Sequence, residues 1–209
     1  MELSSAAQKA LSEFLNEKKL ECSSINNSEK SILYDINLFA ENWNLSQFWY
    51  SGETAKTVAT EALDIHTSGN VGFISFPSAF MAYKNIGADN AYLFEFDKRF
   101  ECYDEFVFYD FNSSSSSCID PIFHYTFDVL VIDPPFLSVD CLTKTLRTAR
   151  LLASENCNYI ICTGKVMETL IYELCGAFLV EFKPEHAKQR LANEFSCFVN
   201  YKSANKTFI

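Results

Sequence analysis

The fold class follows from the stretch Phe127-Asp128-Val129-Leu130-Val131-Ile132-Asp133-Pro134-Pro135-Phe136. Its apolar, β-branched first part predicts a buried strand of a parallel sheet. An acidic residue and two prolines follow, which predicts a rigid turn at the edge where open α/β sheets bind ligands. This turn carries one carboxylate, carbonyl acceptors and one aromatic ring, a set that suits an amino group. An ordinary strand-to-loop turn would use the same residues, so the motif alone leaves both interpretations open.

Strands and helices alternate on both sides of this turn. We expect strands at 71–76, 91–96, 105–109, 127–132 and 159–162, helices at 53–65, 78–85, 140–153 and 166–175, and an antiparallel pair at 178–182 and 195–201. Gly176 is the expected C-terminal cap of the helix before it. This alternation predicts an α/β fold with a doubly wound, mostly parallel sheet and an antiparallel edge. Right-handed crossovers would gather the loops after the parallel strands into one site.

The chain reads as one domain with an N-terminal extension. Residues 4–19 have apolar positions at helical spacing and residues 21–31 are polar, so residues 1–31 are expected to form a helix and a mobile linker. Residues 32–209 then form the α/β domain, because the length suits one sizeable core and no second boundary is visible.

Composition and charge exclude some classes of binding partner and cellular compartment. The net charge is −10, which disfavours a protein that holds nucleic acid through phosphate contacts. No apolar stretch approaches the roughly 20 residues that span a bilayer, and the first residues do not resemble a signal peptide. We therefore expect a cytoplasmic protein without a membrane partner, with its 8 cysteines reduced. No Cys-x-x-Cys pair occurs and the histidines are scattered, so no metal site is expected.

Polar residues follow the first two predicted strands. Ser75, Pro77 and Ser78 follow the first strand without a glycine-rich loop, which disfavours a dinucleotide but still allows a wall for a ligand without phosphate. Glu95 and Asp97 end the second strand, where nucleotide-binding α/β folds place a carboxylate against ribose hydroxyls. Asp97 ranks first because it lies nearer the carboxyl end. A solvated strand end is the plain alternative.

Three further segments contribute candidates. Asp110 and Phe111 follow the third strand and suit framing an adenine ring, or they form a simple turn. Gln47, Trp49 and Tyr50 precede the first core helix and are either a lid over a ligand or a plug in the core. A basic loop is followed by two candidates for positioning a substrate, which a plain hairpin would also explain: Asn193 and Glu194.

Five segments, in this order and spacing, carry a resemblance to a known family: 42–51, 94–100, 128–136, 162–164 and 191–195. The chain resembles the eukaryotic protein-lysine methyltransferases that modify translation elongation factor 1-alpha, which were earlier named as N6-adenine DNA methyltransferases. The resemblance covers about Leu11 to Tyr201. It implies the class I methyltransferase (Rossmann-like) fold with seven strands, S-adenosylmethionine as methyl donor and a lysine side chain as acceptor.

The resemblance also assigns roles to residues. Asp133 would orient the amine, the Pro134 carbonyl would accept an amine proton, and Pro135 and Phe136 would complete and cover the site. Trp49, Tyr50 and Phe136 would line a channel for the lysine stem. The expected partner is elongation factor 1-alpha, bound by a monomer without a metal. Two alternatives stay open: an N6-adenine methyltransferase of nucleic acid, and an inactive binding module with this fold.

Overall fold

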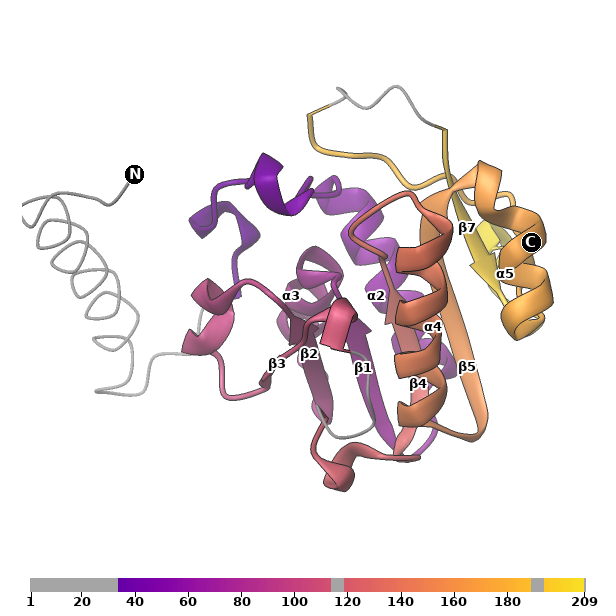
Figure 1. The fold of residues 1–209 in the computed structure, drawn as a ribbon, viewed down its shortest axis with the longest axis horizontal. Coiled ribbons are helices and arrows are strands. Elements are labelled where there is room, and N and C mark those ends of the chain that lie inside the picture. Colours follow the sequence, from indigo (N-terminus) through magenta and orange to yellow (C-terminus); the bar gives the residue numbers. More distant parts are fainter. Residues whose placement is uncertain (1–33, 114–118, 189–193, 209) are drawn as a thin grey trace, which may run out of the picture.

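The computed structural model describes residues 34–113, 119–188 and 194–208. The predicted N-terminal helix and linker lie outside these residues. A seven-stranded sheet in the order β3-β2-β1-β4-β5-β7-β6 forms the centre of the described chain (Figure 1). The strands are β1 (Asn70–Ile74), β2 (Ala91–Glu95), β3 (Phe106–Phe108), β4 (Phe127–Ile132), β5 (Ala153–Gly164), β6 (Phe178–Leu179) and β7 (Phe195–Val199).

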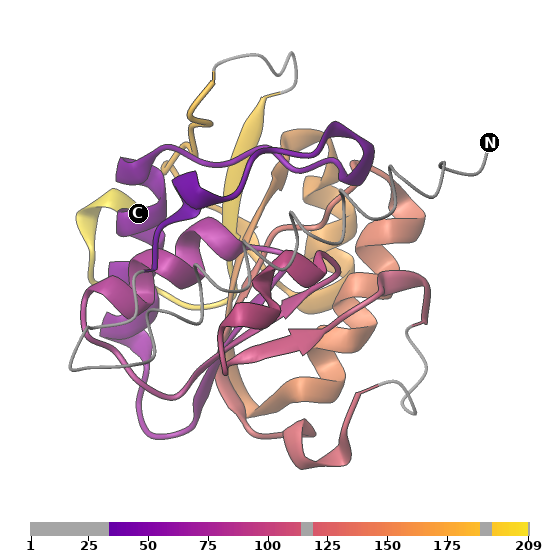
Figure 2. The ribbon, with the colours of Figure 1, turned by 90° about the vertical axis from the view of Figure 1, so that its left-hand side faces the viewer.

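The pairing of the strands confirms the predicted fold class. Strands β1 to β5 pair in parallel, whereas β7 pairs antiparallel with both β5 and β6. Parallel pairing brings the carboxyl ends of β1, β2 and β4 to the same edge of the sheet. Figures 1 and 2 show the segment before α2, drawn in indigo, lying over this edge.

Helices cover both faces of the sheet. These are α2 (Gly52–Ile65), α3 (Pro77–Asn85), α4 (Val139–Leu152) and α5 (Glu168–Cys175). Val129 and Val131 of β4 pack in the same core cluster as residues of α2 and α3, and Leu130 and Ile132 pack with those of α4 and α5. Successive strand residues point to opposite faces, so the apolar run of β4 fills both halves of the core.

The structure shifts several predicted boundaries. Strand β5 begins at Ala153 rather than Tyr159, because Ala153 still pairs with Phe127 across a register shift. Strand β6 is shorter than predicted, since Phe182 leaves the sheet and stacks on Phe208. The helix predicted from Val166 to Cys175 begins as α5 at Glu168, because Lys165–Met167 form a 3₁₀ turn.

Helices α2 and α4 both begin near the carboxyl edge of the sheet, where the candidate ligand-binding residues lie, and a serine caps each of them. Ser51 caps α2 by accepting a hydrogen bond from the Thr54 amide at 3.1 Å, and Ser138 caps α4 by accepting from the Cys141 amide at 3.2 Å. Such caps satisfy amides that the helix leaves unpaired. At the end of α5, Gly176 has φ of 70°, which confirms its role as the C-terminal cap.

Candidate functional site

A cavity of about 440 Å³ opens at the carboxyl edge of the sheet. The residues that line it come from the segment before α2, the ends of β1, β2, β3, β4 and β5, and the loop between β6 and β7. Most of the sequence candidates line this cavity: Gln47, Trp49, Tyr50, Ser75, Pro77, Ser78, Glu95, Asp110, Phe111, Asp133, Pro134, Pro135 and Phe136. The fold thus gathers segments that lie far apart in the sequence.

Asp133 stands at the end of β4, where its backbone amide donates to the Ile74 carbonyl at 3.0 Å. One carboxyl oxygen, Oδ1, accepts a hydrogen bond from the Tyr50 hydroxyl at 3.1 Å. Burial raises the pKa of Asp133 well above its ordinary value, and the charge of Glu95 acts in the same direction, while the Tyr50 hydrogen bond opposes both. The carboxyl group is therefore oriented by Tyr50 and responsive to any positive charge that enters the cavity.

The turn after Asp133 supplies an aromatic wall. Phe136 is 41% exposed, and its ring lies beside that of Phe111, with centroids 5.8 Å apart. Both rings line the cavity, one from the turn after β4 and one from the turn after β3. Ligand surface that packs against these two rings is removed from water.

Glu95 is the last residue of β2 and is almost completely buried. Its Oε1 atom accepts hydrogen bonds from the backbone amides of Phe96 and Asp97, both at 3.0 Å. Burial raises the pKa of Glu95 to about 7, although these amide hydrogen bonds act against the shift. A carboxyl group at the end of β2 thus faces the cavity with its orientation set by the backbone.

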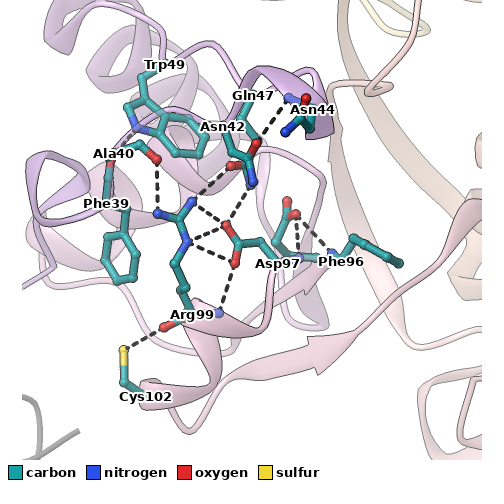
Figure 3. Close-up of polar contacts among 11 residues, drawn as sticks. Phe39, Ala40, Asn42, Asn44, Gln47, Trp49, Phe96, Asp97, Arg99 and Cys102 are labelled. Atoms are coloured by element: carbon teal, nitrogen blue, oxygen red, sulfur yellow. Dashed lines mark hydrogen bonds and ion pairs between the residues drawn. The ribbon is translucent and has the colours of Figure 1, made fainter. Parts of the chain in front are cut away.

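The sequence analysis ranked Asp97 above Glu95 as a ligand contact, but of the two only Glu95 lines the cavity. Asp97 does not line the cavity, because its carboxylate is paired with Arg99 at 2.6 Å and accepts a hydrogen bond from Gln47 at 3.0 Å (Figure 3). Arg99 in turn donates to the Gln47 side chain and to the Ala40 carbonyl. Burial alone would raise the pKa of Asp97, but the hydrogen bonds and charge of Arg99 lower it below its ordinary value. Asp97 therefore anchors the segment before α2.

The turn after β1 has an unusual backbone. Ser75 has φ of 53°, a left-handed backbone conformation that residues other than glycine rarely adopt. Its amide donates a hydrogen bond to the Phe94 carbonyl at 2.9 Å. Pro77 then occupies the first turn of α3, and Ser78 is buried. Strain of this kind persists where the surroundings enforce it and is frequent at ligand sites.

Asp110 has a partly local role. Its carboxyl oxygens accept hydrogen bonds from the Asn112 amide at 2.9 Å and the Ser113 hydroxyl at 3.3 Å, which is the turn that the plain interpretation predicts. Asp110 and Asn112 nevertheless both line the cavity. The two interpretations of this segment are compatible.

Trp49 and Tyr50 differ in their use. The Trp49 indole donates to the Phe39 carbonyl at 2.7 Å and packs edge-on against Phe100, so most of its ring serves the core. Tyr50 is 2% exposed and bonds to Asp133. Both were predicted to line a channel for substrate, and only Tyr50 directs a polar atom at the catalytic candidates.

The candidates after the basic loop lie away from the cavity or outside the described residues. Asn193 falls outside the residues that the structure describes. Glu194 is exposed and does not line the cavity, and its carbonyl accepts from the Lys165 amide at 3.0 Å. The structure therefore gives Glu194 a role in joining β7 to the turn after β5.

Sequence reasoning gave no role to His186, which also lines the cavity. Thr163 and Phe195 line it as well, and both belong to segments that carry the family resemblance. His186 stacks on Tyr50, with ring centroids 4.3 Å apart. A lone histidine in a basic loop carries no local signal of such a contact. Among the described residues, no group of three or more candidate metal ligands is found, and no helix has the length and apolarity to cross a membrane.

Known proteins are similar to this chain in sequence and in fold. The family model described as "Probable N6-adenine methyltransferase" matches residues 41–203. EEF1A lysine methyltransferase 1 of Homo sapiens is 39% identical over 206 residues, covering 97% of this chain and 92% of that protein. The protein-lysine N-methyltransferase EFM5 of Saccharomyces cerevisiae is 38% identical over 194 residues, covering 83% and 77%.

Solved structures with similar folds are much more distant in sequence. A predicted O-methyltransferase from Agrobacterium tumefaciens has a TM-score of 0.52 at 10% identity, covering 69% of this chain and 79% of that chain. Spermidine synthase in complex with a transition-state analogue has a TM-score of 0.51 at 12% identity, covering 77% and 64%. These likenesses establish the class I methyltransferase fold. From the family match and the relatives together, the chain belongs to the family that includes EEF1A lysine methyltransferase 1.

Proposed function

We propose that the chain is an S-adenosylmethionine-dependent protein-lysine N-methyltransferase that acts on translation elongation factor 1-alpha. The observation that carries the proposal is the single cavity that joins Glu95 to the Asp133-Pro134-Pro135-Phe136 turn. A carboxyl group suited to ribose and a turn suited to an amine meet there. The names of the relatives support lysine as the acceptor and elongation factor 1-alpha as the protein.

The cavity fits S-adenosylmethionine. Its volume of about 440 Å³ lies within the range for small-molecule sites, roughly 300–1,000 Å³. Glu95 would bind the ribose hydroxyls, and Asp110 and Phe111 would bind the adenine. Ser75 and Ser78 would hold the amino-acid end beside the start of α3, and Pro77 and Gln47 would complete the walls. In this proposal Glu95, which lines the cavity, takes the ribose role first expected of Asp97. When bound, this cofactor supplies an electrophilic methyl group.

The chain's own residues would orient the acceptor amine. Asp133 and the Pro134 carbonyl accept its N–H groups, and Pro135 keeps the turn rigid because its ring fixes φ. A lysine ammonium, with an ordinary pKa near 10.4, must lose a proton before its nitrogen can attack. Burial of the amine against Phe136 and Tyr50 would lower that pKa, and alignment would supply most of the acceleration.

The surface around the cavity suits a protein. Phe136, which lines the cavity, is 41% exposed. Two further exposed apolar side chains closely follow the lining residues Phe136 and Thr163 in the chain: Val139 at 62% and Val166 at 77%. Leu137 joins them, since it packs over Gly164 at the end of β5. Exposed apolar side chains gathered near one site are typical of a surface that binds a protein partner.

The N6-adenine alternative has the description of the family model in its favour. Against it stand the net charge of −10 and the cost, on the order of a few kcal/mol, of extracting a base from its stack. An inactive binding module would not require Asp133, Tyr50 and Glu95 to converge on one cavity. We further propose that the enzyme acts as a monomer in the cytoplasm, as its expected substrate requires no other compartment.

A parallel comparison of three possible substrates tests the proposal. Purified elongation factor 1-alpha, single-stranded DNA and duplex DNA are each incubated with the chain and a labelled methyl donor under identical conditions. We expect label on lysine, located by mass spectrometry of tryptic peptides. Label in adenine with none on lysine would promote the alternative, and no binding of the donor or its demethylated product would refute the enzyme assignment.

A further inference from the structure

His186 lines the cavity but has no part in the chemistry proposed above. Its ring is only partly buried, lies nearly parallel to the ring of Tyr50 and meets the ring of Phe195 edge-on at 4.6 Å. The planes of His186 and Tyr50 differ by 26°. One face of the imidazole is therefore committed to Tyr50.

The backbone, and not only the side chain, sets the position of His186. Residues 185–187 are joined to the segment before α2 by an isolated antiparallel bridge between Tyr50 and His186. The Ala187 amide donates to the Trp49 carbonyl at 2.8 Å, and the Ser51 amide donates to the Glu185 carbonyl at 2.7 Å. Because these bonds flank His186 on both sides, they hold the backbone that carries its ring beside Tyr50.

The contact continues from Tyr50 to the catalytic candidates. The Tyr50 ring contacts two rings, that of His186 with centroids 4.3 Å apart and that of Phe76 with centroids 4.7 Å apart. This restraint places the Tyr50 hydroxyl 3.1 Å from Asp133 Oδ1. A hydrogen bond weakens steeply as its length and angle depart from these values, so loss of one ring contact would loosen the carboxyl group.

We propose that His186 is a positioning residue of the amine site, whose ring holds Tyr50 in place so that Tyr50 fixes the orientation of Asp133. The inference rests on the proposed function, because Asp133 is assigned there to orient the lysine amine. A displacement of about 1 Å in such a group can reduce turnover by about 100-fold. His186 acts here without touching the reacting atoms.

The charge state of His186 is compatible with this role. Burial lowers the pKa of His186 to about 4, although the negative charge of Glu41 acts in the opposite direction. The ring is therefore neutral at physiological pH. A neutral ring presents no positive charge to an incoming ammonium group, so it can hold Tyr50 without repelling the substrate.

The kinetic test compares substitutions that remove or keep a flat ring. His186→Ala should reduce kcat at least about 10-fold, with the affinity for S-adenosylmethionine changed by less than about threefold. His186→Phe should restore at least about half of kcat, since its ring can stack on Tyr50, whereas His186→Leu should not. Wild type and His186→Phe should share one pH profile. A wild-type kcat in both His186→Ala and His186→Leu, no rescue by phenylalanine, or a shifted profile would overturn the proposal.

A double-mutant cycle tests whether the effect passes through Tyr50. In a Tyr50→Phe background, which lacks the hydroxyl that contacts Asp133, His186→Ala should cause little further loss of kcat. Two independent, multiplying losses would contradict the proposed route. If His186→Ala does not fold, His186→Leu takes its place in the cycle.

A titration that needs no substrate separates this inference from the proposed function. Carbon NMR follows the pKa of the Asp133 carboxyl group, which is faced by Tyr50, Glu95 and Cys162. Because the Tyr50 hydrogen bond lowers that pKa, both Tyr50→Phe and His186→Ala should raise it, with Asp133→Asn identifying the resonance. An unchanged pKa in His186→Ala would refute the positioning role, whatever the enzyme methylates.

Discussion

Glu95→Gln should weaken cofactor binding and, at the same time, stabilise the protein measured without a ligand. The Glu95 carboxyl group is 6% exposed, and burial raises its pKa from 4.5 to about 7. A raised carboxyl pKa means that the folded state keeps its proton where the unfolded state has released it. The free energy of unfolding therefore falls as pH rises from about 4.5 to about 7. Above about pH 7 the Glu95 carboxyl group makes the folded protein roughly 3 kcal/mol less stable than it is below about pH 4.5.

The same pKa sets the pH dependence of binding. If only the carboxylate form accepts hydrogen bonds from ribose, the dissociation constant for S-adenosylmethionine should rise about 10-fold between about pH 8 and about pH 6. Glutamine keeps an oxygen for the amides of Phe96 and Asp97 but does not titrate. The α-amino group of S-adenosylmethionine also titrates near this pH range, and it does so equally with wild type and with Glu95→Gln. The difference between the pH dependences of binding to the two proteins therefore isolates the contribution of Glu95.

Calorimetric titrations at both pH values, with urea unfolding at pH 8 and pH 5, measure both effects. We expect Glu95→Gln to bind more weakly with a flatter pH slope and to gain about 1–3 kcal/mol of stability at the higher pH. Glu101→Gln, an exposed position in the 3₁₀ turn after Asp97, is the matched control and should match wild type. Wild-type affinity and slope in Glu95→Gln would refute the ribose role, and unchanged stability would refute the argument from burial.

Three further predictions concern the turn at Asp133, the pair of Asp97 with Arg99, and the exposed side chain of Val166. Asp133→Ala should keep the fold and cofactor affinity but lose about 100-fold or more in turnover, measured by steady-state kinetics; a folded variant with full activity would show that the turn is only structural. Asp97→Ala should reduce stability by about 1–3 kcal/mol in urea unfolding because it leaves Arg99 and Gln47 without their partner; unchanged stability would show that the anchor is dispensable. Val166→Asp, at a side chain 77% exposed, should raise KM for the protein substrate several-fold with kcat and melting temperature unchanged; an unchanged KM would exclude this part of the rim from docking.

The amino-acid sequence was sufficient to predict the fold class and the turn at Asp133. Strand β4 was predicted with the boundaries that the structure shows, because the pattern of a strand buried on both faces is continuous and local. The Asp133-Pro134-Pro135 turn could also be predicted from a local pattern, because proline restricts the backbone at its own position and at the one before it. Parallel order then predicted that the carboxyl ends of the strands would meet at one edge.

Which residues of that edge face the cavity depends on the packing of the whole chain. The preference for Asp97 assumed that the alternation of a strand continues to its position, but β2 ends at Glu95 and a 3₁₀ turn begins at Lys98. Asp97 consequently turns toward Arg99. The contacts of Tyr50 with Asp133 and His186 join segments that are distant in the chain, so no local pattern encodes them. Periodicity specifies an element and its faces, whereas contacts between elements depend on how the whole chain packs.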